Sequence, residues 1–219
     1  MNNLTDSTYR ASRVTNANAV LRDTYRLLSA TLLWSALAAY LGTLMPVGPI
    51  GSLLVFVLAI GALFATSAYR NSGAGVALVF LFTGLMGFGL GPTLNHYLSL
   101  RGGPEIVGLS LLSTGAAFLG LSAYVNVTKR DFSFLGGVLL TGLIGLLVVG
   151  LVSLFFPIPG LSLVLAYFST LLFSGYILYD TSAIVSGRQS NYVMATVDLY
   201  LNILNLFSSL LRIVSSVFD

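Results

Sequence analysis

Residues 133–156 read SFLGGVLLTGLIGLLVVGLVSLFF, and this stretch contains no charged side chain. An α-helix rises about 1.5 Å per residue, so a run of this length reaches across the ~30 Å hydrocarbon core of a bilayer. The strands of outer-membrane barrels are shorter, about ten residues, and alternate apolar with polar positions. The stretch therefore predicts a transmembrane α-helix.

Six further apolar stretches of similar length accompany it, and each approaches or exceeds the ~20 residues that a crossing needs. The separators between them are short and rich in Pro and Gly, as in Asn71-Ser72-Gly73 and Gly102-Gly103-Pro104. Such short connections predict antiparallel neighbours, so the fold class is an all-α, polytopic bundle of seven transmembrane helices. The predicted spans are residues 27–45, 50–69, 75–98, 105–127, 133–156, 161–180 and 192–217.

The composition agrees with a membrane protein. Of the 219 residues, 56% are hydrophobic and only 8% are charged, whereas soluble domains carry about 25% charged residues. Disorder is excluded because it requires low hydrophobicity and high charge. The chain has no cysteine and a single histidine, which argues against disulfides, a zinc site or a haem, so we expect no cofactor. The net charge of +3 comes from basic residues between apolar runs, which predicts a bilayer as partner and no nucleic acid.

Residues 1–26 are polar and precede the first predicted crossing, which divides the chain into a tail (1–26) and a membrane domain (27–219). No apolar run comes before Leu27, so the tail is not a cleaved signal peptide; a helix is predicted after Asn18. If the N-terminus lies in the cytoplasm, the outer loops hold only Arg101. This positive-inside bias predicts a cytoplasmic N-terminus and a C-terminus on the outer side. The basic residues on the inner side are then Arg10, Arg13, Arg22, Arg26, Arg70, Lys129, Arg130 and Arg188.

The last span carries a polar stripe. Its members follow one another at intervals of +4, +3, +4 and +3, which places them on one face of a helix. Such a face cannot point to lipid, so the seventh helix is predicted to be central. The Asn and Ser side chains either have a function or only join helices through hydrogen bonds. The stripe consists of Asp198, Asn202, Asn205, Ser209 and Arg212.

Asp180 is predicted to end the sixth helix on its inner side, and Asp198 to begin the seventh on that same side. Two neighbouring carboxylates cannot both be ionised without strong repulsion. Such a pair can hold a proton, bind a cation or act as a pH-sensitive latch. The alternative is that Asp180 is simply hydrated at the headgroup level.

The third and fourth stretches add packing signals. Gly87 and Gly91 form a GxxxG pattern, which predicts close helix approach. Pro92 lacks a backbone donor and predicts a kink. Glu105, on the outer rim, is a candidate partner for Arg212.

Five motifs resemble the Bax inhibitor family, and the resemblance, which runs from about Ala19 to Ile213, is strongest to its bacterial YccA-like branch. It implies seven transmembrane helices with the last one wrapped by the other six. It also implies a bacterial inner-membrane protein that binds the FtsH protease and restrains its digestion of membrane proteins, with a tail long enough to serve that protease as a handle. The motifs are Phe82-Thr83-Gly84, Gly91-Pro92-Thr93-Leu94-Asn95, Ser133-Phe134-Leu135-Gly136-Gly137, Tyr179-Asp180-Thr181 and the run from Leu199 to Phe207.

The same resemblance implies an alternative function, a pH-sensitive leak of calcium ions or protons, because some members use two aspartates in the sixth and seventh helices. Asp180 matches the first aspartate. Asn202 stands at the second position, and Asp198 lies one turn earlier on the same face. A cation or proton site at Asp180, Asp198 and Asn202 is therefore an expectation, and the leak is compatible with regulation of FtsH.

An enzyme is the third functional hypothesis, after a regulator and an ion leak. Tyr179-Asp180 with the later Asp198 resembles an intramembrane aspartyl protease, but that family needs Gly-x-Gly-Asp, and this chain has Thr196-Val197-Asp198. Leu172-Phe173-Ser174-Gly175 lacks the first glycine of a rhomboid serine motif. We therefore expect no catalytic residues.

Overall fold

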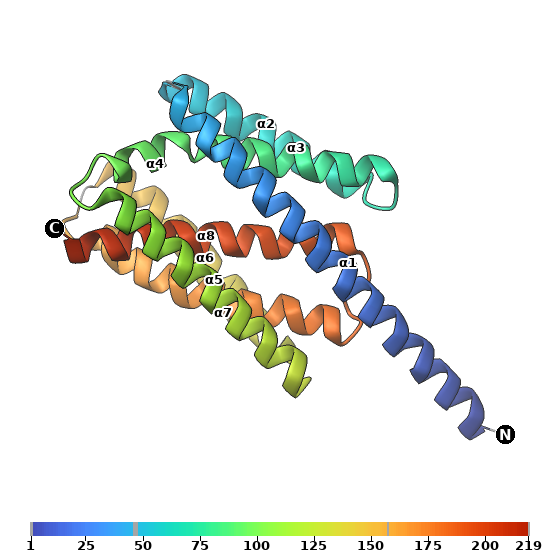
Figure 1. The fold of residues 1–219 in the computed structure, drawn as a ribbon. Helices are drawn as coiled ribbons and strands as arrows, with labels where there is room; N and C mark the ends of the chain where they lie inside the picture. The colour runs from blue at the N-terminus through green and yellow to red at the C-terminus, as the bar shows by residue number, and fades with distance from the viewer. Residues whose placement is uncertain (1, 46–47, 157, 219) are drawn as a thin grey trace. The chain divides into compact units, whose positions relative to one another are not determined.

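The computed structural model describes residues 2–45, 48–156 and 158–218 (Figure 1). Side chains are described from residue 17 onward. All regular elements in these ranges are helical. In chain order they are α1 (Asn2–Leu44), α2 (Pro49–Ala68), α3 (Gly73–Gly89), α4 (Gly91–Leu98), α5 (Gly103–Thr128), the 3₁₀ turn η1 (Ser133–Leu135), α6 (Gly136–Phe155), α7 (Leu161–Val185) and α8 (Tyr192–Phe218).

Seven segments are long and apolar enough to cross a membrane, which confirms the predicted fold class. The α3 and α4 helices together form the third span, so α8 is the seventh. The turn residues lie where predicted: Pro49 opens α2, and Gly102 precedes α5 in the left-handed conformation. Two further predicted separators, at residues 46–49 and 157–160, contain Pro46, Val47 and Pro157, which lie outside the described ranges. The spans are Ala17–Leu44, Pro49–Ala68, Gly73–Leu98, Gly103–Thr128, Ser133–Phe155, Leu161–Val185 and Tyr192–Phe218.

Two helices are longer than predicted. The α1 helix begins at Asn2 rather than after Asn18, because residues 2–41 contain neither Gly nor Pro to interrupt it. The α7 helix continues to Val185, so Asp180 lies inside a helix and does not end one. The division into a 1–26 tail and a 27–219 membrane domain stays a prediction.

The predicted kink at Pro92 appears as a break at Leu90, which separates α3 from α4. The Leu90 amide donates to Gly87 and Phe88, and the α-helical pattern resumes when the Leu94 amide donates to Leu90. Pro92, two residues after the break, has no backbone N–H and so cannot donate the hydrogen bond that would continue the α-helical pattern. The chain thus bends within its third span.

The residues group into two compact units, Met1–His96 with Ile184–Tyr200, and Tyr97–Ala183 with Leu201–Asp219. In the first unit, α3 packs against both α1 and α2 (Figure 1). Glycines allow the contact with α1: a Cβ on Gly87 would collide with Ser35, and a Cβ on Gly91 with the backbone of Gly42. The GxxxG prediction of close approach is confirmed.

The first unit also contains a buried polar contact that the sequence did not reveal. The Tyr200 hydroxyl lies 2.7 Å from Ser35 Oγ and donates to the Thr83 carbonyl at 3.1 Å. All three residues are buried, and the ring of Phe82 packs edge-on against Tyr200. Tyr200 therefore ties α8 to α1 and α3.

We expect Tyr200→Phe to lower thermal stability in detergent by about 1 kcal/mol, because Ser35 and the Thr83 carbonyl lose a partner. Tyr40→Phe is the matched control, since Tyr40 is 60% exposed. Melting curves of the two purified variants test this. Equal midpoints for Tyr200→Phe and the wild type would contradict a stabilising role for the hydroxyl.

The second unit has its own apolar core, in which Phe173 and Ile177 of α7 meet Leu206 of α8. Side chains of α5 and α6, including Phe118 and Leu143, pack around them. The first unit's part of α8 is also buried, since Val193, Ala195, Val197, Leu199 and Tyr200 are at most 1% exposed. That the seventh span is central to the whole bundle stays a prediction.

Candidate functional site

Asp180 and Asn202 meet within the membrane-spanning part of the second unit. Asn202 Nδ2 donates to Asp180 Oδ2 at 2.7 Å, and this bond joins α7 to α8. Asn202 is only 5% exposed and Asp180 is partly buried. Hydrogen bonds to a charged acceptor are shorter and stronger than neutral ones. The resemblance to the family singled out these two positions, and the structure brings them together.

Asp198 belongs to the first unit and has a different partner. Gln189 Nε2 donates to Asp198 Oδ2 at 3.4 Å, from the connection between α7 and α8. That connection is fixed by Asn191, whose Oδ1 accepts from the Met194 amide and whose Nδ2 donates to Asn71 Oδ1 at 2.8 Å. Gln189 and Asn191 are polar loop residues of a common type, so no sequence signal marked them. The approach of Asp198 to Asp180 stays a prediction.

The remaining stripe residues of α8 line a polar pocket of the second unit. Asn205 Nδ2 donates to the Leu201 carbonyl, and Ser209 Oγ donates to the Asn205 carbonyl. Arg212 is exposed, and no described residue accepts a hydrogen bond from its guanidinium; the candidate ion pair with Glu105 is not formed. The pocket measures about 280 Å³, and its polar lining comes from Ser153, Ser162, Ser169, Asn205, Ser209 and Arg212, among others.

The serines of α6 and α7 in this pocket were missed by the sequence reasoning. On α7 the lining positions are Ser162, Leu165, Ala166 and Ser169, whose i, i+3, i+4, i+7 spacing repeats that of Asn205, Ser208, Ser209 and Arg212 on α8. Isolated serines are common in transmembrane helices, and only this shared spacing could have drawn attention to them.

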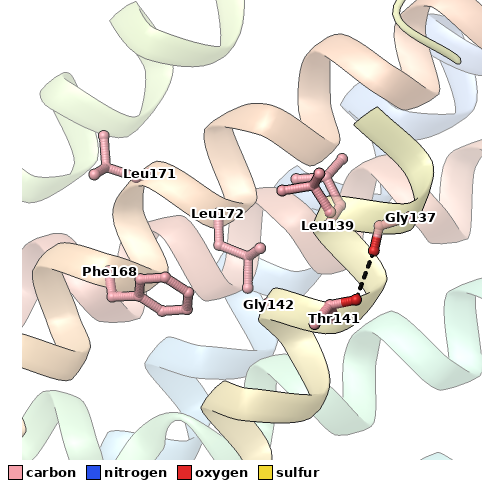
Figure 2. A pocket seen from close by; sticks show the side chains of 8 residues that line it. Gly137, Leu139, Thr141, Gly142, Phe168, Leu171 and Leu172 are labelled. Carbon is pink, nitrogen blue, oxygen red and sulfur yellow. Dashed lines mark hydrogen bonds between the residues drawn. The ribbon is translucent and has the colours of Figure 1, made fainter. Parts of the chain in front are cut away.

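An apolar groove lies between α6 and α7, with a volume of about 580 Å³ (Figure 2). Gly142 forms its floor, because a Cβ there would collide with Leu172 and meet Phe168. On the α6 side the Thr141 hydroxyl donates a hydrogen bond to the Gly137 carbonyl of the same helix at 2.9 Å. The hydroxyl proton of Thr141 is therefore already used within α6, and the groove stays apolar on this side.

Among the described residues, no group of three or more His, Cys, Asp or Glu side chains is placed to hold a metal ion. Calcium prefers six to eight oxygen ligands, several of them carboxylates. Asp180 is therefore not part of such a carboxylate cluster within the described residues.

These features define a class: a seven-span helical membrane protein whose last helix carries a polar face, with a carboxylate–amide pair between its last two helices. The family model for inhibitors of apoptosis-promoting Bax1 matches residues 17–218. The chain belongs to this Bax inhibitor family.

Its relatives cover nearly the whole chain. An uncharacterized membrane protein of Vibrio cholerae is 46% identical, over 92% of this chain and 91% of its own. The modulator of FtsH protease YccA of Escherichia coli strain K12 is 38% identical, over 97% of both chains. The corresponding protein of Escherichia coli strain CFT073, named inner membrane protein YccA, has the same identity and coverage.

Proposed function

We propose that this chain is an inner-membrane regulator that binds the membrane-bound protease FtsH and restrains its degradation of membrane proteins. The observation that carries the proposal is the 38% identity, over 97% of both chains, to a protein named as a modulator of FtsH. A regulator of this kind works through contact surfaces and needs no catalytic residues. The chain is embedded in the lipid bilayer, and the protease complex is its protein partner.

The exposed face of α6 supports contact with another transmembrane helix. This span is the least buried of the seven. Gly137, Thr141 and Gly145 follow one another at four-residue intervals and are not buried. A Cβ on Gly137 or Gly145 would meet nothing within 4 Å. Small residues at this spacing let a second helix approach closely, so we propose this face for docking.

Capture of FtsH tests both parts of the proposal. We expect the tagged wild-type chain, purified from native membranes in mild detergent, to retain FtsH. Gly145→Leu should reduce that retention several-fold, because a leucine would hold the partner helix away. The matched control is Gly108→Leu on α5, another position where a Cβ meets nothing. Absence of FtsH from the wild-type eluate would reject the function, whereas equal loss in both variants would reject only the α6 face.

The proposed orientation rests on the basic residues: the N-terminus is cytoplasmic and the C-terminus periplasmic. A reporter that is active only in the periplasm should be active when fused after Asp219. The same reporter fused after Thr128, on the opposite side after four spans, should be inactive. The reverse pattern would overturn the orientation, and activity at both sites would overturn the number of crossings.

A second candidate function, a pH-sensitive leak of calcium ions or protons, is favoured by the Asp180–Asn202 hydrogen bond. An ionisable residue at membrane depth is a functional candidate in its own right. Here it lies at the contact of two helices, where a change of charge alters their packing. Asp198 is the third proposed member of this site.

A further inference from the structure

The pocket formed by α6, α7 and α8 in the second unit carries an inference about a ligand. Its one ionisable lining residue is Arg212, and no acidic side chain lines it within the described residues. Its volume of about 280 Å³ lies near the lower end of the range of small-molecule sites, roughly 300 Å³. The pocket therefore has a net positive charge and room for a small group.

Besides the exposed Ser162, two side chains in this pocket have hydrogen-bond donors to spare. Ser169 is 8% exposed, and its hydroxyl has no partner among the described residues, whereas Ser153, Ser208 and Ser209 donate to carbonyls of their own helices. The Arg212 guanidinium is also unpaired within that part of the chain. An acceptor that enters the pocket therefore gains a hydrogen bond from each of these two groups.

The N-terminal end of α7 favours an anion at the same place. Ser162 is the second residue of α7, so the pocket lies at the N-terminal end of this helix, where the helix dipole attracts negative charge. Arg212 stands six residues before Phe218, the end of α8, which corresponds to about 9 Å along the axis. Both positions are near the end of a span, which is the part of a transmembrane helix closest to the lipid headgroups.

We propose that this pocket binds a phosphate group, with Arg212 and Ser169 as the residues that hold it. A guanidinium presents paired N–H donors that match two phosphate oxygens, and the Ser169 hydroxyl supplies a further donor. The phosphate belongs either to an anionic phospholipid of the surrounding leaflet or to free phosphate. Leu165 and Ala166 complete the α7 side of the pocket and bring no negative charge to it.

Native mass spectrometry of the full chain, released from nanodiscs of phosphatidylcholine with a minor share of phosphatidylglycerol, tests the proposal. We expect phosphatidylglycerol to be enriched on the wild type, and Arg212→Gln to reduce this enrichment at least five-fold. Ser169→Ala should reduce it two- to three-fold. Arg101→Gln is the matched control, because Arg101 is an exposed cation of the same unit that does not line the pocket.

A second arm separates the two sources of phosphate. In nanodiscs of phosphatidylcholine alone, titration with inorganic phosphate is followed by calorimetry. Saturable binding that Arg212→Gln abolishes supports the site with a free anion as ligand. Binding in neither arm overturns the proposal, and so does an equal loss in Arg101→Gln.

Arg212→Lys distinguishes a built site from a cation that merely extends toward the headgroups. Lysine keeps the charge but lacks the paired N–H donors, so we expect it to lose most of the enrichment. Full enrichment in Arg212→Lys together with an unchanged Ser169→Ala would show attraction by charge alone and would overturn the site. Unchanged melting curves of the variants confirm that they are folded.

Discussion

Gly91→Leu is expected to destabilise the folded protein strongly. A Cβ at this position would lie against the carbonyl oxygen, Cα and carbonyl carbon of Gly42, which are backbone atoms that no side-chain rotation can move away. Overpacking of a core typically costs about 1–3 kcal/mol, and a collision with backbone belongs at the upper end. For a chain of this size that corresponds to a melting point lower by roughly 6–12 °C. Gly42→Leu should give a similar loss, because the two glycines face each other.

The control for this prediction is Gly61→Leu on α2, which lies in the same unit and is exposed, and where an added Cβ would meet nothing within 4 Å. Its melting point should stay within about 1–2 °C of the wild type, since surface substitutions rarely exceed ±0.5 kcal/mol. Size-exclusion elution and melting curves in one detergent provide both readouts. A wild-type melting point for Gly91→Leu would mean that α1 and the α3–α4 junction do not cross as closely as described.

The spans could be predicted because the length and composition of an apolar run determine whether it partitions into a bilayer. The close approach of helices at Gly87 and Gly91 could also be predicted. Two helices can cross closely only where small residues lie one turn apart, and that spacing is visible in the sequence. Asp180 shows where this reasoning stops. Its charge suggested a helix end, but Thr181 and Ser182 after it are helical and buried, so α7 continues.

The pairing of polar residues across helices could not be predicted. The Ser35–Tyr200 contact joins positions 165 residues apart, and it depends on how each helix is rotated about its axis. Hydropathy does not determine that rotation. The family resemblance did point to Asp180 and Asn202 as a pair, because related chains share the rotation of each helix about its axis. It gave no information on Gln189 as the partner of Asp198, since that residue lies in a connection without a motif.

The leak hypothesis gives the second large effect, and Asn202→Asp is its sharpest test. The Asn202 amide donates to Asp180, so it holds α7 and α8 together while Asp180 is ionised. A carboxylate in its place would lie beside the Asp180 carboxylate, and two ionised groups at that distance repel strongly. As the pH rises and both become ionised, the helices should separate and the flux should increase. We therefore expect a calcium or proton flux that rises several-fold more steeply with pH in Asn202→Asp than in the wild type.

Matched variants identify which residues control the flux in proteoliposomes between about pH 6 and pH 8. Asp180→Asn removes the repelling charge and should flatten the dependence on pH. Asn205→Asp adds a carboxylate one turn further along the same face, where the native side chain donates only to Leu201 of its own helix, and should leave the dependence unchanged. Asp198→Asn should flatten it only if Asp198 performs the role that an amide at position 202 cannot. If neither the wild type nor Asn202→Asp conducts above empty liposomes, the leak hypothesis is rejected, and the Asp180–Asn202 bond serves to hold the last two helices together.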